Sequence, residues 1–243
     1  AVSLSSDGSI IAIGAPWHEG NGYYNSGQVR VFKNFNNNWI QIGSDIDGKG
    51  DNYSLGKSLN LSYDGSVLAI GAPWNEGNGD ASGQVRVFKY LNNSWIQIGA
   101  DINGKEPYEY FGWSLSLASD GSTLAIGSRN DPIRIFKNIN NNWNEVSFDR
   151  TVSFNVNGDG TSVNLSSDGS IIAIGGSRRD SNNDYVSIFK NVDNVWEQIG
   201  SDIQSSSSWG YVNGGTSMDL SSDGSVIAIG SDLANSIKGR VSV

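Results

Sequence analysis

Few side chains in this sequence could carry out nucleophilic catalysis or bind zinc. The chain has 243 residues, of which one is histidine and none is cysteine. A Ser-His-Asp triad needs a general base, and a tetrahedral zinc site needs several nitrogen or sulfur ligands. The single histidine, His18, lies in the segment WHEGNG, and the related segment WNEGNG has Asn75 at that position. A residue that alternates with asparagine is better explained as a turn residue, so both kinds of chemistry are disfavoured.

Carboxylates are the remaining catalytic candidates, because a pair of them can hydrolyse a glycosidic bond. The candidates are Asp45, Asp47, Asp51, Glu76, Asp80, Asp101 and Glu106. Most of them lie at positions that recur along the chain, and a recurring aspartate is better explained by a hairpin or an Asx turn than by one asymmetric active site. The sequence therefore predicts no enzymatic activity, and a glycan-active enzyme that uses paired carboxylates is the alternative.

One acidic segment has the alternation of oxygen ligands that calcium sites use. Asp45, Asp47 and Asp51 in SDIDGKGD could supply three carboxylates, and backbone carbonyls of the glycine-rich loop could complete the shell. The second copy of this segment offers only Asp101 and Glu106 as acids. A solvated turn is the preferred interpretation, so no cofactor is predicted, and calcium at the three aspartates is the alternative.

The tryptophans divide into two groups. One group recurs at a fixed position of the repeat described below and is explained by packing, since each buried aromatic ring covers roughly 150–250 Å². The other group lies in or beside loops and consists of Trp17, Trp74, Trp113 and Trp209. These four are the predicted ligand-binding residues, because tryptophan is enriched at binding surfaces.

An internal repeat positions all of these residues. An Asp-Gly step recurs five times at spacings of 48 to 57 residues, with its aspartates at Asp7, Asp64, Asp120, Asp168 and Asp223. Around each step the chain alternates in polarity and is rich in strand-forming residues, as in SLNLS, VRVF and WIQIG. Each copy therefore reads as four short strands.

The turns between these strands predict how they pair. Asp-Gly between two strands predicts a type I′ hairpin, in which both central residues have positive φ. Asparagine-rich segments join the third and fourth strands of a copy. One copy is thus a four-stranded antiparallel meander, and about 50 residues per meander is typical of a propeller blade. The predicted fold is an all-β, five-copy β-propeller, with a linear β-solenoid as the weaker alternative.

The repeat also predicts the domain organisation. The whole chain, residues 1–243, forms one β-propeller domain. Its blades are expected at approximately 1–56, 57–112, 113–160, 161–215 and 216–243. The last copy lacks its fourth strand, so we expect the segment to belong to a longer protein, with a larger intact ring as an open alternative.

Several motifs resemble those of a known repeat family. Phe111-Gly112 before SLSL, and Gly14–Pro16 and Gly71–Pro73 after the second strand, resemble the FG-GAP repeats of integrin-type β-propellers. The run WIQIGxDIxG, GxSLxLSxDGSxxAIGAP and GQVRVFK is similar to repeats in surface proteins of marine bacteria, especially Bacteroidetes, and of algae. The resemblance spans nearly the whole chain and implies an extracellular binding or adhesion scaffold. The family's calcium loops are not carried over, because SSDGS and SYDGS hold one carboxylate each.

Net charge and hydropathy exclude two classes of partner. The net charge is -9 and no run of Lys or Arg occurs, so neither nucleic acid nor insertion into a membrane is expected. The predicted function is a non-enzymatic adhesion scaffold whose loops contact a protein or glycan partner. The predicted location is extracellular, at the cell surface. A structural spacer or secretion-cargo domain is a further alternative.

Overall fold

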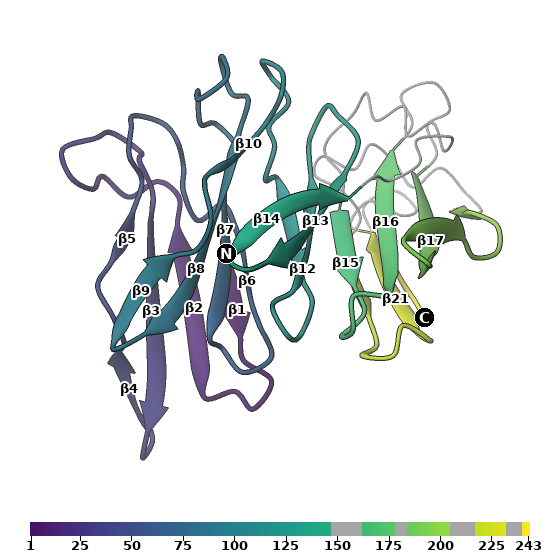
Figure 1. Cartoon of the computed structure of the whole chain (residues 1–243), viewed down its shortest axis with the longest axis horizontal. Helices are drawn as coiled ribbons and strands as arrows, with labels where there is room; N and C mark the ends of the chain where they lie inside the picture. The colour runs from purple at the N-terminus through teal and green to yellow at the C-terminus, as the bar shows by residue number, and fades with distance from the viewer. Residues whose placement is uncertain (147–161, 178–183, 205–216, 232–239) are drawn as a thin grey trace.

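The computed structural model describes residues 1–146, 162–177, 184–204, 217–231 and 240–243. Within these ranges every helix-or-strand element is a strand, which confirms the all-β prediction. The strands form five antiparallel sheets that stand side by side like blades (Figure 1), and this arrangement confirms the β-propeller fold class. None of the described segments forms a helix of the length and apolarity that a membrane crossing requires.

Each sheet falls within one of the predicted blade ranges. The first sheet holds β1 (Val2–Leu4), β2 (Ile10–Ala15), β3 (Gln28–Phe35), β4 (Asn38–Gln41) and β5 (Ile46–Asp47). The second holds β6 (Ser58–Leu61), β7 (Val67–Ala72), β8 (Gln84–Leu91), β9 (Ser94–Gln97) and β10 (Ile102–Asn103). The third holds β11 (Ser114–Leu117), β12 (Thr123–Gly127), β13 (Arg134–Ile139) and β14 (Asn142–Val146).

The last two sheets follow the same order. The fourth holds β15 (Ser162–Leu165), β16 (Ile171–Ser177), β17 (Asp184–Val192), β18 (Val195–Gln198) and β19 (Ile203–Gln204). The fifth holds β20 (Ser217–Leu220), β21 (Ile227–Ser231) and β22 (Arg240–Ser242). In the first, second and fourth sheets, two short strands pair with the same long strand at the outer edge. The pairs are β4 and β5 on β3, β9 and β10 on β8, and β18 and β19 on β17.

The Asp-Gly hairpins do not have the predicted turn type. Gly8 has a φ of 67°, whereas Asp7 is not among the residues with positive φ. The Gly8 N–H donates to the Ser5 carbonyl at 2.9 Å, and the Asp7 carboxylate accepts from the Ser9 N–H and the Ser5 hydroxyl. The type I′ prediction is therefore wrong at this turn, because the aspartate caps a loop in which the glycine alone takes the left-handed conformation.

The asparagine-rich turns have the geometry that was expected of the Asp-Gly turns. Asn36 and Asn37 both have positive φ, of 49° and 65°, and they join β3 to β4. The equivalent pairs are Asn92 and Asn93, Asn140 and Asn141, and Asp193 and Asn194. Two consecutive left-handed residues are what a type I′ hairpin requires, and asparagine tolerates that conformation.

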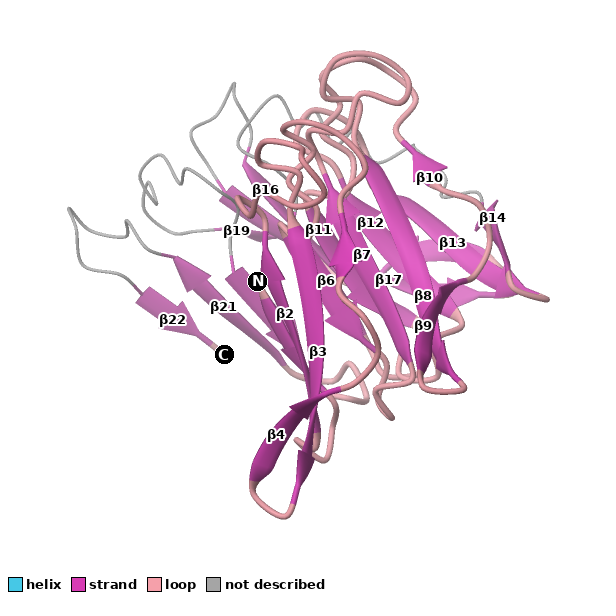
Figure 2. Cartoon of the chain, turned by 90° about the vertical axis from the view of Figure 1, so that its left-hand side faces the viewer, coloured by secondary structure: helices cyan, strands magenta, loops and turns pink. Residues whose placement is uncertain are grey.

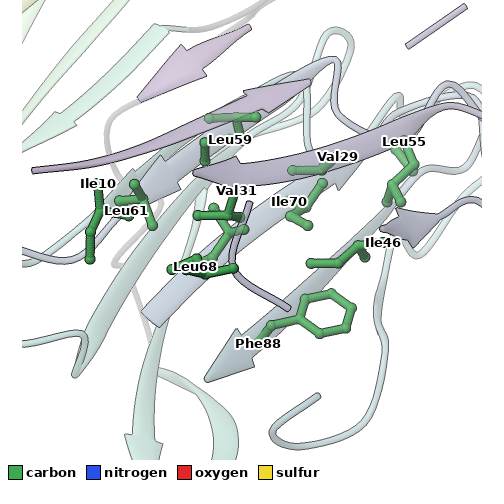
Figure 3. Close-up of a cluster of buried hydrophobic side chains, with 13 residues drawn as sticks. Ile10, Val29, Val31, Ile46, Leu55, Leu59, Leu61, Leu68, Ile70 and Phe88 are labelled. Carbon is green, nitrogen blue, oxygen red and sulfur yellow. The ribbon is translucent and has the colours of Figure 1, made fainter. Parts of the chain in front are cut away.

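The hydrophobic core lies between neighbouring sheets. Figure 3 shows the first of these seams, where side chains of β2 and β3 meet those of β6 and β7. The contributors include Ile10, Val29, Val31, Leu59, Leu61, Leu68 and Ile70. A single sheet cannot bury its apolar face alone, so each blade is stabilised by the blade beside it.

Hydrogen bonds at every seam repeat with the blades. The backbone N–H of Ser6 donates to the Tyr63 carbonyl at 3.0 Å, and Tyr63 donates in turn to Ser119 at 2.9 Å. The series continues from Ser119 to Ser167 and from Ser167 to Ser222. The innermost strands β1, β6, β11, β15 and β20 stand side by side in that order. These bonds fix the position of each blade along the row.

Candidate functional site

The longer loops gather at one end of the sheets, opposite the hairpin turns (Figure 2). At this end, the segment that leads into the next blade lies close to a glycine at the end of the second strand of the blade before it. A Cβ atom at Gly14 would lie 2.2 Å from the Gly56 carbonyl oxygen, and one at Gly71 would lie 2.3 Å from the Gly112 carbonyl oxygen. Only glycine permits this approach, so the residues that follow these glycines are held close to one another.

Three of the four predicted tryptophans meet at this end of the molecule. Trp17 follows β2, Trp74 follows β7, and Trp113 directly precedes β11. The ring centroids of Trp17 and Trp74 are 5.9 Å apart, and those of Trp74 and Trp113 are 5.5 Å apart. Trp17 is 62% exposed. The three indoles therefore form a row across the first three blades, whereas Trp209 lies outside the described residues.

A tyrosine and two cations complete this row. The Tyr110 ring lies 6.2 Å from Trp74 and 6.3 Å from Trp113, edge to face with both. The Lys57 ammonium lies 5.0 Å from the centre of the Trp113 ring, and the Arg129 guanidinium lies 5.3 Å from it. Such cation–π contacts place a positive charge beside an aromatic surface. We call Trp17, Lys57, Trp74, Tyr110, Trp113 and Arg129 the aromatic platform.

A buried carboxyl group lies in the residue before Tyr110, and its oxygen accepts from the backbone N–H groups of Lys105 and Glu106. Glu109 is 2% exposed and precedes Tyr110 in the chain, and its carbonyl accepts the Arg129 N–H at 3.1 Å. Burial raises the pKa of Glu109, and hydrogen bonds from the backbone of Lys105 and Glu106 oppose that rise. Glu109 can therefore hold a proton at a higher pH than an exposed glutamate.

Sequence reasoning missed Lys57, Tyr110, Arg129 and Glu109. The signal that could have found them is a comparison of the copies position by position. Lys57 and Trp113 occupy the same place before the first strand of their blades, as do Tyr53 and Glu109 four residues earlier. Positions at which one copy departs from another can carry an asymmetric site, whereas identical positions build the blades.

The three aspartates of the calcium alternative are not grouped as a metal site. Each carboxylate has its own protein partners: Asp45 accepts from Arg30 and Gln41, Asp47 from Gln28 and Asn21, and Asp51 from the Tyr24 N–H. The hydrogen bond from Gln41, followed by the contacts with Arg30, lowers the pKa of Asp45 despite some burial. The described residues contain no group of three histidine or acidic side chains placed to hold a metal ion.

No protein-family model matches the sequence, and no curated protein is similar to it in sequence. Three solved structures are similar in fold. A Bacteroides uniformis protein provisionally named a 6-phosphogluconolactonase is 19% identical, with a TM-score of 0.56; the match covers 83% of this chain and 53% of that one. The periplasmic gluconolactonase PpgL of Pseudomonas aeruginosa is 14% identical, with a TM-score of 0.58, over 99% of this chain and 70% of that one. The Dos1 propeller is 14% identical, with a TM-score of 0.57, over 99% of this chain and 57% of that one.

At these identities the likeness establishes the β-propeller fold, and the chain spans about half the length of the Bacteroides protein. The comparisons contradict the prediction of a non-enzymatic adhesion scaffold, because two of the three similar propellers are named as lactonases. That prediction rests on repetition without an asymmetric set of side chains, whereas Lys57, Trp113 and Arg129 break the repeat. The alternative of a glycan-active enzyme agrees better with the names of these two propellers.

Proposed function

We propose that this protein is a hydrolase that acts on a sugar-derived substrate with a negatively charged group, such as the lactone of a sugar acid. The aromatic platform carries this proposal, because it combines a row of neighbouring, mutually tilted indoles with two cations at one end of the propeller. The names of two similar propellers, a gluconolactonase and a 6-phosphogluconolactonase, support the choice of substrate.

Different platform residues bind different parts of the proposed substrate. One face of a sugar ring presents C–H groups, which pack on the electron-rich face of an indole such as Trp17 or Trp74. Lys57 and Arg129 attract the anionic group of the substrate, and this attraction matters because the chain as a whole carries a charge of -9. The same two cations can stabilise the negative charge that develops on a carbonyl oxygen during hydrolysis.

Glu109 is the proposed proton donor and acceptor. Lactone hydrolysis adds the oxygen of water to the carbonyl carbon, breaks the ring C–O bond and places a proton on the released oxygen. A carboxyl group whose pKa is raised by burial can exchange that proton closer to neutral pH. A backbone hydrogen bond of 3.1 Å from the Arg129 N–H to the Glu109 carbonyl joins the segment of Glu109 to that of Arg129.

The direct test is a hydrolysis assay of the purified chain with gluconolactone and with 6-phosphogluconolactone. The rate of proton release is measured and compared with the rate of spontaneous hydrolysis. We expect Trp113→Ala and Lys57→Met each to lower kcat/KM at least about tenfold, which corresponds to a loss of about 1.4 kcal/mol of transition-state binding. Trp39→Ala is the matched control, because Trp39 is an exposed indole outside the platform. Equal rates for Trp113→Ala and Trp39→Ala, or no acceleration by the parent chain, would overturn the proposal.

The role of Glu109 has its own readout. We expect the pH profile of kcat/KM to show an ionisation above the ordinary glutamate range, and we expect Glu109→Gln to remove that ionisation. A Glu109→Gln variant with reduced activity and an unchanged pH profile would assign Glu109 a purely structural role.

Glycoside hydrolysis is the second candidate function, and one observation favours it. The negative charge of Asp131 adds to the rise in the pKa of Glu109, so the two carboxyl groups interact electrostatically. A second carboxyl group that helps to raise the pKa of the first is the kind of arrangement that a glycosidase needs for its general acid. Release of reducing ends from a polysaccharide panel, abolished by Asp131→Asn, would favour this function; lactone hydrolysis that survives Asp131→Asn would favour the first.

We also propose that the protein works outside the cytoplasm, at the cell surface, where a glycan is the source of its substrate. The absence of cysteine is compatible with export, and one similar propeller is a periplasmic protein. The same proposal places the repeats with the FG-GAP family, and it includes neither nucleic acid nor membrane insertion. Fractionation of the source cells with an antibody against the chain tests the location, and recovery in the cytoplasm alone would contradict it.

A further inference from the structure

We propose that the aromatic platform binds an oligosaccharide rather than a single sugar, with the acidic end of the chain at Trp113 and its neutral units over Trp74 and Trp17. This substrate class rests on the proposed function, because it concerns the same site. Three properties of the platform support it: the length of the row of indoles, the tilt between their rings, and the position of the two cations at one end.

The row of indoles is longer than one sugar. Trp17, Trp74 and Trp113 come from the first, second and third blades, and their ring centroids are separated by steps of 5.9 Å and 5.5 Å. A pyranose ring is similar in size to the six-membered ring of an indole, so a single sugar covers one tryptophan and leaves the others bare. A chain of sugar units can place a C–H face on each indole in turn.

The end of the row at Trp17 is open to solvent. Trp17 is 62% exposed, whereas Trp74 and Trp113 are half-buried. The third blade has Asn130 at the position of Trp17 and Trp74, so this tryptophan is not required to build a blade. An exposed tryptophan outside the repeated packing positions is available to contact a ligand, and tryptophan is enriched among the residues that dominate binding energy.

The tilt between the rings disfavours a flat ligand. The planes of Trp17 and Trp74 are inclined by 48°, and those of Trp74 and Trp113 by 56°. A planar aromatic molecule that stacks on one of these rings therefore meets the next ring at a steep angle. A glycan has rotatable bonds between its units, so each unit can turn to match its own indole. The arrangement favours a chain of sugars over a nucleobase or another planar ring system.

The two cations of the platform lie at one end of the row. The Lys57 ammonium and the Arg129 guanidinium lie over the Trp113 ring, and Arg129 is also 5.6 Å from the centre of the Tyr110 ring. Among the described residues, no cation–π contact involves Trp17. Because Coulomb attraction weakens with distance, an acidic group is held most strongly at Trp113. The neutral units of the chain then extend towards Trp17.

Tyr110 fixes the junction between the charged and neutral parts of the row. Its ring lies edge to face with both Trp74 and Trp113. Its backbone has a φ of 54°, which is uncommon for a bulky residue, and its N–H donates to the Ala81 carbonyl at 2.9 Å. Strained residues of this kind cluster at ligand sites, because the surrounding structure must enforce them. The angle between the two indoles is therefore set before a ligand binds, which lowers the entropic cost of binding.

The test compares acids of increasing chain length. Gluconic, cellobionic and cellotrionic acids share one acidic end and differ in the number of neutral glucose units attached to it. They are also the products of hydrolysis of the corresponding lactones. We expect calorimetric titration of the purified chain to give a Kd at least about tenfold lower for cellotrionic acid than for gluconic acid, because each neutral unit adds a contact with an indole.

Substitutions separate the effect of length from the effect of charge. Trp17→Ala should reduce the ratio of the two affinities to below about threefold, because the last neutral unit loses its contact. Lys57→Met should weaken the binding of all three acids by a similar factor, because it removes a charge from the end that they share. Trp39→Ala is the matched control, since Trp39 is an exposed indole outside the platform, and it should leave the ratio unchanged.

The outcomes distinguish this substrate class from the proposed function. Equal affinities for the three acids, in a chain that hydrolyses gluconolactone, would reduce the platform to a site for one sugar and leave the hydrolase function in place. A gain in affinity with length that Trp17→Ala and Trp39→Ala reduce equally would place the neutral units outside the row. The expected ratio in a chain that hydrolyses none of the lactones would support the oligosaccharide site and overturn the hydrolase function. Binding of none of the acids would overturn the oligosaccharide site.

Discussion

The first and second blades have similar sequences in their first two strands, yet these strands occupy opposite environments. Leu59, Leu61 and Ile70 of the second blade are core, whereas the corresponding residues of the first blade face solvent. The strands, hairpins and registers are the same in both blades. The comparison shows that burial in this fold belongs to the seam between two blades, and that a blade's own sequence cannot determine it.

The largest expected difference between the two blades concerns one isoleucine position. Ile70→Ala removes a fully buried side chain from the core and should lower the free energy of unfolding by about 2–5 kcal/mol. Ile13→Ala removes a side chain that is already 40% exposed, and should cost less than about 1 kcal/mol. Urea denaturation of both variants measures the difference, and equal losses would mean that a neighbour covers Ile13 in solution.

Arg86 and Arg30, which occupy the same position of the repeat, should show a smaller difference in stability. Arg86→Met removes charged hydrogen bonds to Gln97 and to the Asp47 carbonyl from a side chain that is 10% exposed, and should cost about 2–3 kcal/mol. Arg30→Met removes a solvent-exposed ion pair with Asp45, which is worth about 0–1 kcal/mol. Thermal unfolding of the two variants compares them. If Arg30→Met proved as costly as Arg86→Met, the solvent-exposed description of Arg30 would be wrong.

Alanine substitutions at the turn glycines Gly8 and Gly65 distinguish the cost of backbone strain from the cost of overpacking. Gly8 and Gly65 have φ of 67° and 70°, so an alanine at either position should cost about 1 kcal/mol in the left-handed conformation. Gly65→Ala also meets Ile10 across the seam, which should add about 1 kcal/mol because a well-packed core resists an extra methyl group. Calorimetry of the two variants tests this order, and a Gly8→Ala variant less stable than Gly65→Ala would reverse it.

Acid stability should show the smallest effect. Hydrogen bonds from the Ser5 hydroxyl and then from the Ser9 N–H lower the pKa of Asp7 from 3.8 to about 2. The unfolded chain then binds a proton more readily than the folded chain, so this contribution to stability is present above about pH 4 and is lost as the pH falls towards 2. Titration of the Asp7 carboxyl by NMR measures the shift, and Ser5→Ala should return the pKa towards 3.8. An unchanged pKa in Ser5→Ala would exclude the hydroxyl as the main cause.

The blades could be predicted from the sequence because their signals are local. Alternating polarity and the recurring Asp-Gly step identified the strands, and the fold class followed from their number and spacing. The turn type at Asp7 could not be predicted, because it depends on a hydrogen bond between the carboxylate and Ser5. In the tight turn at Asn36 and Asn37 both residues take the left-handed conformation, which asparagine tolerates.

The candidate site was predictable only in part. Trp17, Trp74 and Trp113 could be selected as loop aromatics, but nothing in their spacing shows that three separate blades bring them together. Lys57 reaches the Trp113 ring from the neighbouring blade, and Arg129 lies over the same ring from within its own blade. The acidic segment of Asp45 and Asp47 shows the opposite case, since its spacing resembles a calcium loop while its carboxylates bind Arg30, Gln28 and other protein groups.

The series of backbone hydrogen bonds from Ser6 to Ser222 has an evolutionary consequence. Each of these hydrogen bonds links the same atoms at the same place in consecutive blades. The free energy of unfolding is therefore close to a sum of contributions from the blades and from each pair of adjacent blades. Unequal recombination that inserts or deletes one whole copy leaves each remaining link intact. Genes of this kind can therefore change the number of their modules in a single event, while the loops opposite the links diverge freely.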